Sequence, residues 1–170
     1  MTTSTDDYLT PLTNFLSVSS NESDRGKVLV ATSQIDGMLE DILRAFLMDS
    51  VPTDQLFAGP NAPLSSLFNK ANLAKSLGLI DDNEHQAISI MRKIRNDFAH
   101  SVHANFDNPR TSDQVANLTF GLKSLVDQSD PIIESPKTRF SMSAVSIISS
   151  LYNRAHFVSR QKRTASEWQI

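Results

Sequence analysis

Cysteine is absent from the 170-residue sequence, and neither sign of charge is in large excess. Without cysteine the chain can have no disulfide, thiolate zinc site, iron–sulfur cluster or cysteine nucleophile, and we expect a protein of the reducing cytoplasm. The 16 Lys and Arg residues are outnumbered by 19 Asp and Glu residues, which gives a formal net charge of -3. The surface as a whole is therefore not a polycation, and binding to nucleic acid would need a local basic patch.

The sequence also lacks a long hydrophobic run. Its N-terminus, MTTSTDDYLT, is polar and acidic, whereas a secretory signal needs a basic start and an apolar stretch. The most apolar segment, residues 28–48, is interrupted by charged residues, namely Asp36, Glu40, Asp41 and Arg44. Hydrocarbon does not tolerate charges on several sides of a helix, so we expect a buried helix and no contact with a membrane.

Several catalytic signatures are missing as well. The chain contains no Gly-x-x-x-x-Gly-Lys loop, no Gly-x-Gly-x-x-Gly turn, no Gly-x-Ser-x-Gly elbow and no His-Glu-x-x-His. Nucleotide hydrolysis and serine acyl transfer therefore lose their usual sequence support. His100 and His103 could share one metal from successive turns, but His85 and His156 lie far off in the sequence, so a metal site is disfavoured. We expect no metal and no cofactor.

The positions of proline divide the chain into helical segments. No proline occurs between Pro11 and Pro52 or between Pro63 and Pro109, so long helices are expected there. Apolar residues at three- and four-residue spacing predict helices over residues 23–48, 64–77 and 81–100. Ser23 is the expected N-cap of the first, Gly78 ends the second, and Asp81 with Glu84 forms a capping box for the third.

Two further predictions concern the loop at residues 49–63 and Gly37, which lies inside the first long helix. Residues 49–63 read as an ordered loop or short turns, with Gly59 and Pro60 in a turn and Pro63 opening the next helix. Gly37 costs its helix about 1 kcal/mol relative to alanine, and close approach of another helix is the expected reason.

Weaker signals complete the assignment. We expect a turn at residues 105–110, a helix through residues 115–126, a short extended piece at 137–140 and a last long helix through 145–155. A short opening helix is expected around Tyr8, Leu12, Phe15 and Leu16. Since no segment alternates with period two, the predicted fold is an all-α, single-domain bundle of about five to seven helices. Its predicted parts are an N-terminal arm with a short helix (1–22), the helical domain (23–158) and a loose basic tail (159–170).

The densest group of polar residues lies at the end of the helix that begins near Asp81. It comprises Arg92, Lys93, Arg95, Asn96, Asp97, His100 and His103. Residues four apart share a helix face, so Arg92, Asn96 and His100 should line up, with Arg95 about 100° away from Asn96. Guanidinium groups bind phosphate, and an imidazole transfers protons near neutral pH. Arg95, Asn96 and His100 are thus candidate catalytic residues for metal-independent RNA cleavage, and Arg92, Lys93, Arg95 and His103 are candidates for binding nucleic acid.

A structural role explains the same residues. Basic side chains in a last helical turn interact favourably with the helix dipole, and His100 can satisfy free carbonyl groups. Arg95 can pair with Asp97 or with an acid from another helix. The C-terminal segment leaves the same choice open, between a phosphate-binding strip and a frayed helix end, for its basic residues Arg154, His156, Arg160, Lys162 and Arg163.

Two family resemblances bear on this choice. The segment Ile94 to His100 resembles the Arg-x4-6-His signature of HEPN domains. A wider set of blocks, namely Ser23 to Gly26, Leu56 to Ser66, Ala74 to Ile80 and Ile94 to His100, resembles the MltR family, which is named for the mannitol operon repressor. HEPN domains are small all-α proteins that often dimerise and in many members cleave RNA.

The wider resemblance implies a helical regulator, a repressor or co-repressor of a sugar-alcohol operon of the mannitol type. The expected state is a homodimer that acts through a protein partner. A free-standing helix-turn-helix is disfavoured, because Glu84 stands where the second helix should present an apolar residue. The alternative, implied by the narrower resemblance, is a HEPN-type endoribonuclease that uses Arg95 and His100.

Overall fold

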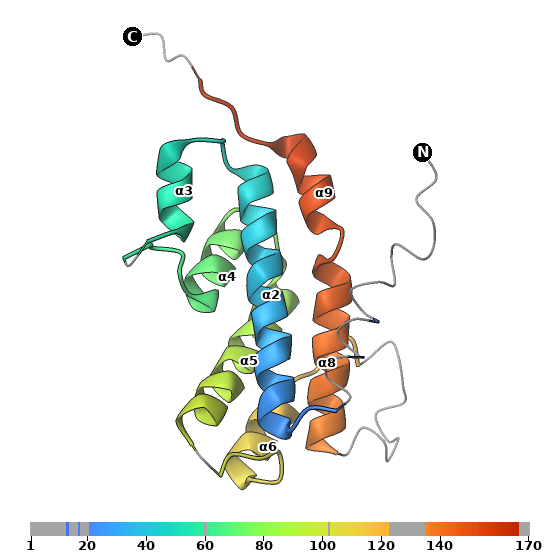
Figure 1. Cartoon of the computed structure of the whole chain (residues 1–170). Helices are drawn as coiled ribbons and strands as arrows, with labels where there is room; N and C mark the ends of the chain where they lie inside the picture. The colour runs from blue at the N-terminus through green and yellow to red at the C-terminus, as the bar shows by residue number, and fades with distance from the viewer. Residues whose placement is uncertain are drawn as a thin grey trace.

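The computed structural model describes residues 13, 17, 21–59, 61–101, 103–122 and 135–166. Over these residues the chain is all-α, without any strand, and forms a single domain, as predicted (Figure 1). Its elements are α2 (Asp24–Phe46), α3 (Val51–Phe57), α4 (Leu67–Ser76), α5 (Asp82–His100), α6 (Pro109–Ala116), α8 (Pro136–Leu151), α9 (Arg154–Val158) and the 3-10 turn η1 (Ser159–Gln161). The opening helix was expected from Tyr8, Leu12, Phe15 and Leu16, and all four lie outside the described residues.

Helix α2 is the central element of the bundle. The Ser23 side chain caps its start by accepting a hydrogen bond from the Gly26 backbone N–H at 3.1 Å, as predicted. One face of α2 is fully buried at helical spacing, through Val28, Ala31, Ile35, Leu39 and Ile42. This helix contacts α4, α5, α8 and α9, and Figure 1 shows α8 and α9 following one another along one side of it.

Helix α5 carries the predicted polar group and is held at both ends. At its start, Asp81 and Glu84 form the predicted capping box, and Gly78 just before it has a φ of 72°, the left-handed conformation that glycine allows. At its end, Phe98 packs on Phe106, which packs on Phe140 of α8, with ring centroids 5.2 and 5.4 Å apart. These contacts fix where the last turn of α5 emerges.

Two ionic networks tie distant helices together. Lys70 of α4 is buried and donates hydrogen bonds to Asp36 at 3.0 Å and Glu40 at 2.9 Å on α2. Glu84 of α5 is 1% exposed and accepts a hydrogen bond from Arg154 of α9 at 2.6 Å. Burial opposes both ionised forms, so these pairs exist only because each charge meets its partner.

Several sequence predictions are corrected by the structure. Residues 51–57 form the helix α3 rather than loop or turns, because Ser50 caps it and Pro52 is compatible with the first turn. Of the helix expected through 115–126, only residues 115 and 116 are helical among residues 115–122; they end α6, which begins at Pro109 because Asn108 caps it, and residues 123–126 lie outside the described residues. Residues 137–140 are helical and belong to α8.

The end of the final helix and the start of α4 also differ from the prediction. The last long helix stops at Leu151, and a separate helix, α9, follows from Arg154. Pro63 does not open a helix, because α4 begins at Leu67 with Ser66 as its cap. Gly37 is exposed, and no described residue lies within 4 Å of the Cβ that another residue would add there, so none of the described helices packs closely against it.

The C-terminal segment contacts the end of α2. The backbone N–H of Arg163 donates to the Phe46 carbonyl at 2.8 Å, and the Lys162 ammonium lies 2.7 Å from the Asp49 carboxylate. Arg154, which the sequence groups with this basic segment, instead points into the bundle toward Glu84. The basic residues at this end therefore do not form one continuous strip.

Candidate functional site

The predicted polar group lies on the last turns of α5 and just beyond its end. Successive residues there point in different directions around the helix axis. Ile94 and Phe98 are fully buried, which turns Arg95 and His100 outward into solvent. Asn96 and Asp97 lie between these extremes and are half-buried. The amphipathic pattern of α5 thus exposes the guanidinium and the imidazole at the same end of one helix.

The hydrogen bonds of this group separate Asp97 from its neighbours. The Arg95 Nη1 donates to Asn96 Oδ1 at 3.3 Å, and Arg95 forms no ion pair among the described residues. Asp97 instead accepts hydrogen bonds from Arg110 at 3.1 Å and Gln114 at 2.7 Å, both on α6. Asp97 therefore holds α6 against α5 and does not neutralise Arg95.

Three residues of the predicted group line a groove of about 500 Å³. Arg92, Arg95 and Asn96 form its α5 wall. Lys93, His100 and His103 are exposed but do not line it. The structure therefore brings Arg92, Arg95 and Asn96 together in one groove, and the other predicted residues lie outside it.

The other walls of the groove come from α2 and from the start of α4. Helix α2 contributes Thr32, Ser33 and Asp36, and the segment that opens α4 contributes Ser65, Ser66, Leu67 and Phe68. Two of the hydroxyl groups are already engaged, because Thr32 donates to the Val28 carbonyl at 2.8 Å and Ser66 accepts from the Asn69 N–H at 3.2 Å. The hydroxyls of Ser33 and Ser65 have no such partner within the described part of the chain.

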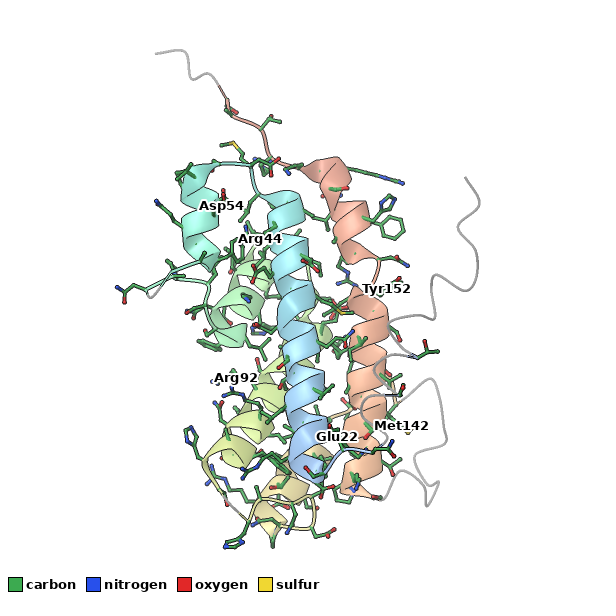
Figure 2. All side chains as sticks on the ribbon, viewed as in Figure 1. Glu22, Arg44, Asp54, Arg92, Met142 and Tyr152 are labelled. Atoms are coloured by element: carbon green, nitrogen blue, oxygen red, sulfur yellow. The ribbon has the colours of Figure 1, made fainter. Side chains whose placement is uncertain are left out.

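Arg92 is the most distinctive residue of the groove. Its guanidinium stacks on the ring of Phe68, 4.7 Å from the ring centroid, and Phe68 is 43% exposed. The Arg92 Nε is buried without a hydrogen-bond partner, and no acid pairs with this guanidinium among the described residues. Figure 2 shows Arg92 pointing outward from α5, and its contact with Phe68 places it beside the start of α4. A half-buried cation without a counter-ion attracts an anion electrostatically.

Asp36 is the one carboxylate among the groove's lining residues, and it shares the Lys70 ammonium with Glu40. Its Oδ2 accepts a hydrogen bond from Lys70 at 3.0 Å, while its Oδ1 is buried without a partner. Burial alone would lower the pKa of Lys70, but its hydrogen bonds to Glu40 and Asp36 outweigh this effect and raise the pKa. For Glu40, burial raises the pKa, and the hydrogen bonds from Lys70 and Arg44 lower it further than burial raises it. Lys70 and Glu40 therefore remain charged at neutral pH.

The residues that sequence reasoning missed lie outside α5. Phe68 belongs to the apolar spacing that predicts the helix over residues 64–77 and hence a buried position, yet its ring is exposed and supports Arg92. The pair Ser33 and Asp36, three residues apart on α2, is the only local signal that a second polar wall exists. Spacing places them on one face, but it does not reveal which helix they face.

The described residues contain neither a metal site nor a membrane-spanning helix. Among those that the structure describes, no three His, Asp or Glu side chains lie close enough to hold a metal ion. In the same part of the chain, every helix is too short or too polar to cross a membrane.

Comparisons with known proteins bear on the fold. No family model matches the sequence, and no curated protein matches it. A chain of a solved structure, described as the X-ray structure of the MtlR–HPr complex from Escherichia coli, matches with a TM-score of 0.57 and 16% sequence identity. The match covers 90% of this chain and 99% of that chain. The two proteins therefore share their fold over nearly their whole lengths.

Proposed function

We propose that this protein is an MtlR-type transcriptional regulator, a repressor or co-repressor of a sugar-alcohol operon of the mannitol type, which acts through a protein partner. The observation that carries the proposal is the shared fold, which extends over 90% of this chain and 99% of a chain in the MtlR–HPr complex. The sequence blocks between Ser23 and His100 that resemble the MltR family support it independently. The proposed partner is a protein of the HPr type, and the proposed assembly of this chain is a homodimer.

The packing of α5 supports a partner-based mechanism over direct reading of DNA. In a helix-turn-helix built from α4, Gly78 and α5, position 84 should be apolar and packed against the first helix. Glu84 is instead ionised, 1% exposed and bound to Arg154 of α9. Burial raises the pKa of Glu84, but the hydrogen bonds from Arg154, Ser150 and the Asp81 N–H lower it further. This helix pair is therefore built around an ion pair with a third helix.

The regulatory role is tested in cells and with purified proteins. We expect that deleting the gene raises expression of the sugar-alcohol operon in cells grown without mannitol, and that the intact gene restores repression. Isothermal titration calorimetry of the purified chain with HPr from the same organism should show saturable binding. Unchanged operon expression together with absence of HPr binding would refute the proposal. Sedimentation at several protein concentrations checks the homodimer separately.

A second candidate is the HEPN-type, metal-independent endoribonuclease. The observation that favours it is that Arg95 and His100 are both exposed on the last turns of α5, and neither is paired with an acid in the described residues. In this proposal Arg95 binds the phosphate, His100 transfers the proton and Asn96 orients Arg95. Arg92, Lys93 and His103 would add contacts to the RNA backbone.

The nuclease proposal has a direct test. Purified protein should cut single-stranded RNA in the presence of EDTA, and Arg95→Ala and His100→Ala should each abolish cleavage while the far-UV circular dichroism stays unchanged. Lys75→Ala is the control and should keep the cleavage, because Lys75 is a cation of α4 that pairs with Asp82 and has no assigned contact with RNA. Cleavage that survives in both active-site variants would identify a contaminating nuclease and remove this candidate.

A further inference from the structure

The groove between α2, α4 and α5 contains more positive charge than its surroundings neutralise. Arg92 and Arg95 both line it, and neither forms an ion pair with a described residue. The one carboxylate among the lining residues, Asp36, accepts a hydrogen bond from the Lys70 ammonium at 3.0 Å, which it shares with Glu40, so the lining residues carry two positive charges and one negative charge. Two guanidinium groups facing one space can hold the oxygens of a single phosphate, and they bind it more strongly than neutral donors do.

The rest of the wall matches a polyhydroxy compound. Ser33 and Ser65 present hydroxyls that no described residue engages, and Asp36 Oδ1 is an acceptor without a donor. The hydroxyl groups of a ligand both donate and accept hydrogen bonds, so they can pair with the Ser33 hydroxyl, the Ser65 hydroxyl and Asp36 Oδ1 at the same time. The groove volume of about 500 Å³ lies within the range of small-molecule sites.

We propose that this groove binds a phosphorylated polyol, with Arg92 and Arg95 on the phosphate and Ser33, Ser65 and Asp36 on the hydroxyl groups of the chain. The phosphate assignment rests on the groove alone, whereas the choice of a polyol as the body of the ligand also rests on the proposed function. Phe68 holds the Arg92 guanidinium in place by stacking on it. The ligand would then set the regulatory state of the protein.

A small ligand fits the groove better than a polynucleotide. A polymer needs a track of cations along several successive phosphates. The other basic residues of the predicted group, Lys93, His100 and His103, do not line the groove. The two cations that do line it are three residues apart on one helix, which suits one phosphate group.

Calorimetric titration of the purified full chain tests the proposal with four probes, namely mannitol 1-phosphate, mannitol, inorganic phosphate and a single-stranded RNA oligonucleotide. We expect mannitol 1-phosphate to bind at least about tenfold more tightly than mannitol or inorganic phosphate, because only this compound uses both halves of the groove. Arg95→Gln should weaken its binding by about tenfold to a hundredfold, since one charge-assisted contact is lost.

Matched variants separate the two halves of the site. Lys93→Gln removes the same charge from the same helix outside the groove and should leave the affinity unchanged. Ser33→Ala should weaken the binding of mannitol 1-phosphate but not that of inorganic phosphate. Arg95 is exposed, so its variant is expected to fold, and the thermal midpoint of each variant verifies this.

Four results would overturn the inference. They are no binding of mannitol 1-phosphate, an equal loss of affinity in Lys93→Gln and Arg95→Gln, equally tight binding of inorganic phosphate, and tighter binding of the RNA. Because these titrations use only the purified protein, they do not depend on operon expression or on HPr binding. Repression in cells with no ligand bound in vitro would therefore refute this inference and leave the proposed function intact.

Discussion

Replacement of Arg154 by methionine should strongly destabilise the fold, because it leaves a carboxylate buried without its main partner. The Arg154 guanidinium donates to Glu84 Oε2 at 2.6 Å, to the Leu79 carbonyl at 3.1 Å and to Ser150 Oγ at 3.1 Å. The Glu84 side chain is 2% exposed and the Arg154 side chain 26% exposed. Methionine retains much of the apolar volume, so the change mainly removes charge and hydrogen bonds.

The size of the effect follows from the burial of the two groups. Breaking a fully buried ion pair costs about 3–5 kcal/mol, and losing a hydrogen bond to a charged group costs about 1.5–3 kcal/mol. Since Arg154 is partly exposed and Glu84 keeps the Ser150 hydroxyl and the Asp81 N–H, we expect a loss of about 2–4 kcal/mol. In a domain of this size that corresponds to a fall in Tm of about 4–16 °C.

The loss of stability in Arg154→Met should also depend on pH. In the native protein the pKa of Glu84 is below its ordinary value of 4.5, so its contribution to stability is complete above that pH and is lost as the pH falls through the folded-state pKa. In Arg154→Met burial is opposed only by the hydrogen bonds from Ser150 and the Asp81 N–H, so the pKa of Glu84 rises relative to the native protein and acid relieves more of the penalty. The difference in stability between the two proteins should therefore shrink as the pH falls toward 4.5 and below.

Urea unfolding followed by far-UV circular dichroism measures these differences. Lys162→Met is the control, because Lys162 also forms an ion pair with Asp49, but that pair is exposed and its loss should cost less than about 1 kcal/mol. A loss below about 1 kcal/mol in Arg154→Met, or a loss of the same size at neutral and acidic pH, would contradict the assignment of Glu84 as a buried, charged partner.

Three further predictions concern stability and use the same unfolding assay. Gly37→Ala should stabilise the protein by about 0.5–1 kcal/mol, because the added Cβ meets open space in mid-helix; a destabilised variant would contradict this reading. Ser23→Ala should cost about 1 kcal/mol through loss of the α2 cap, and an unchanged midpoint would show that the cap is not formed. Lys70→Met should cost about 1–3 kcal/mol at neutral pH, because Asp36 and Glu40 lose their shared partner; an equally stable variant would refute the network.

The long helices were predictable because their signals are local. The Ser23 cap, the Asp81 and Glu84 capping box and the positive φ of Gly78 each involve residues within a few positions of one another, and all three are present. Predictions failed where competing local signals are weak. Lys137 to Phe140 was expected to be extended, yet it lies in the first turns of α8, where packing of Phe140 in the core decides the conformation.

The candidate site was predictable only on its α5 side. Helical spacing placed Arg92, Arg95 and Asn96 near one another, and they line one groove. Spacing also placed His100 near Asn96, yet His100 does not line that groove. Phe68 shows the limit of periodicity most clearly, because it fits the apolar pattern of its helix but is 43% exposed beneath a guanidinium.

The sequence by itself determined that the chain is all-α, where α2 and α5 begin, and which α5 residues share a face. Only the tertiary structure decided which charges meet. Lys70 finds its partners 34 and 30 residues away, and Arg154 finds Glu84 at a separation of 70 residues. The physical reason is range, because capping and periodicity act within about one or two helical turns, whereas a buried ion pair depends on which helix faces packing brings together.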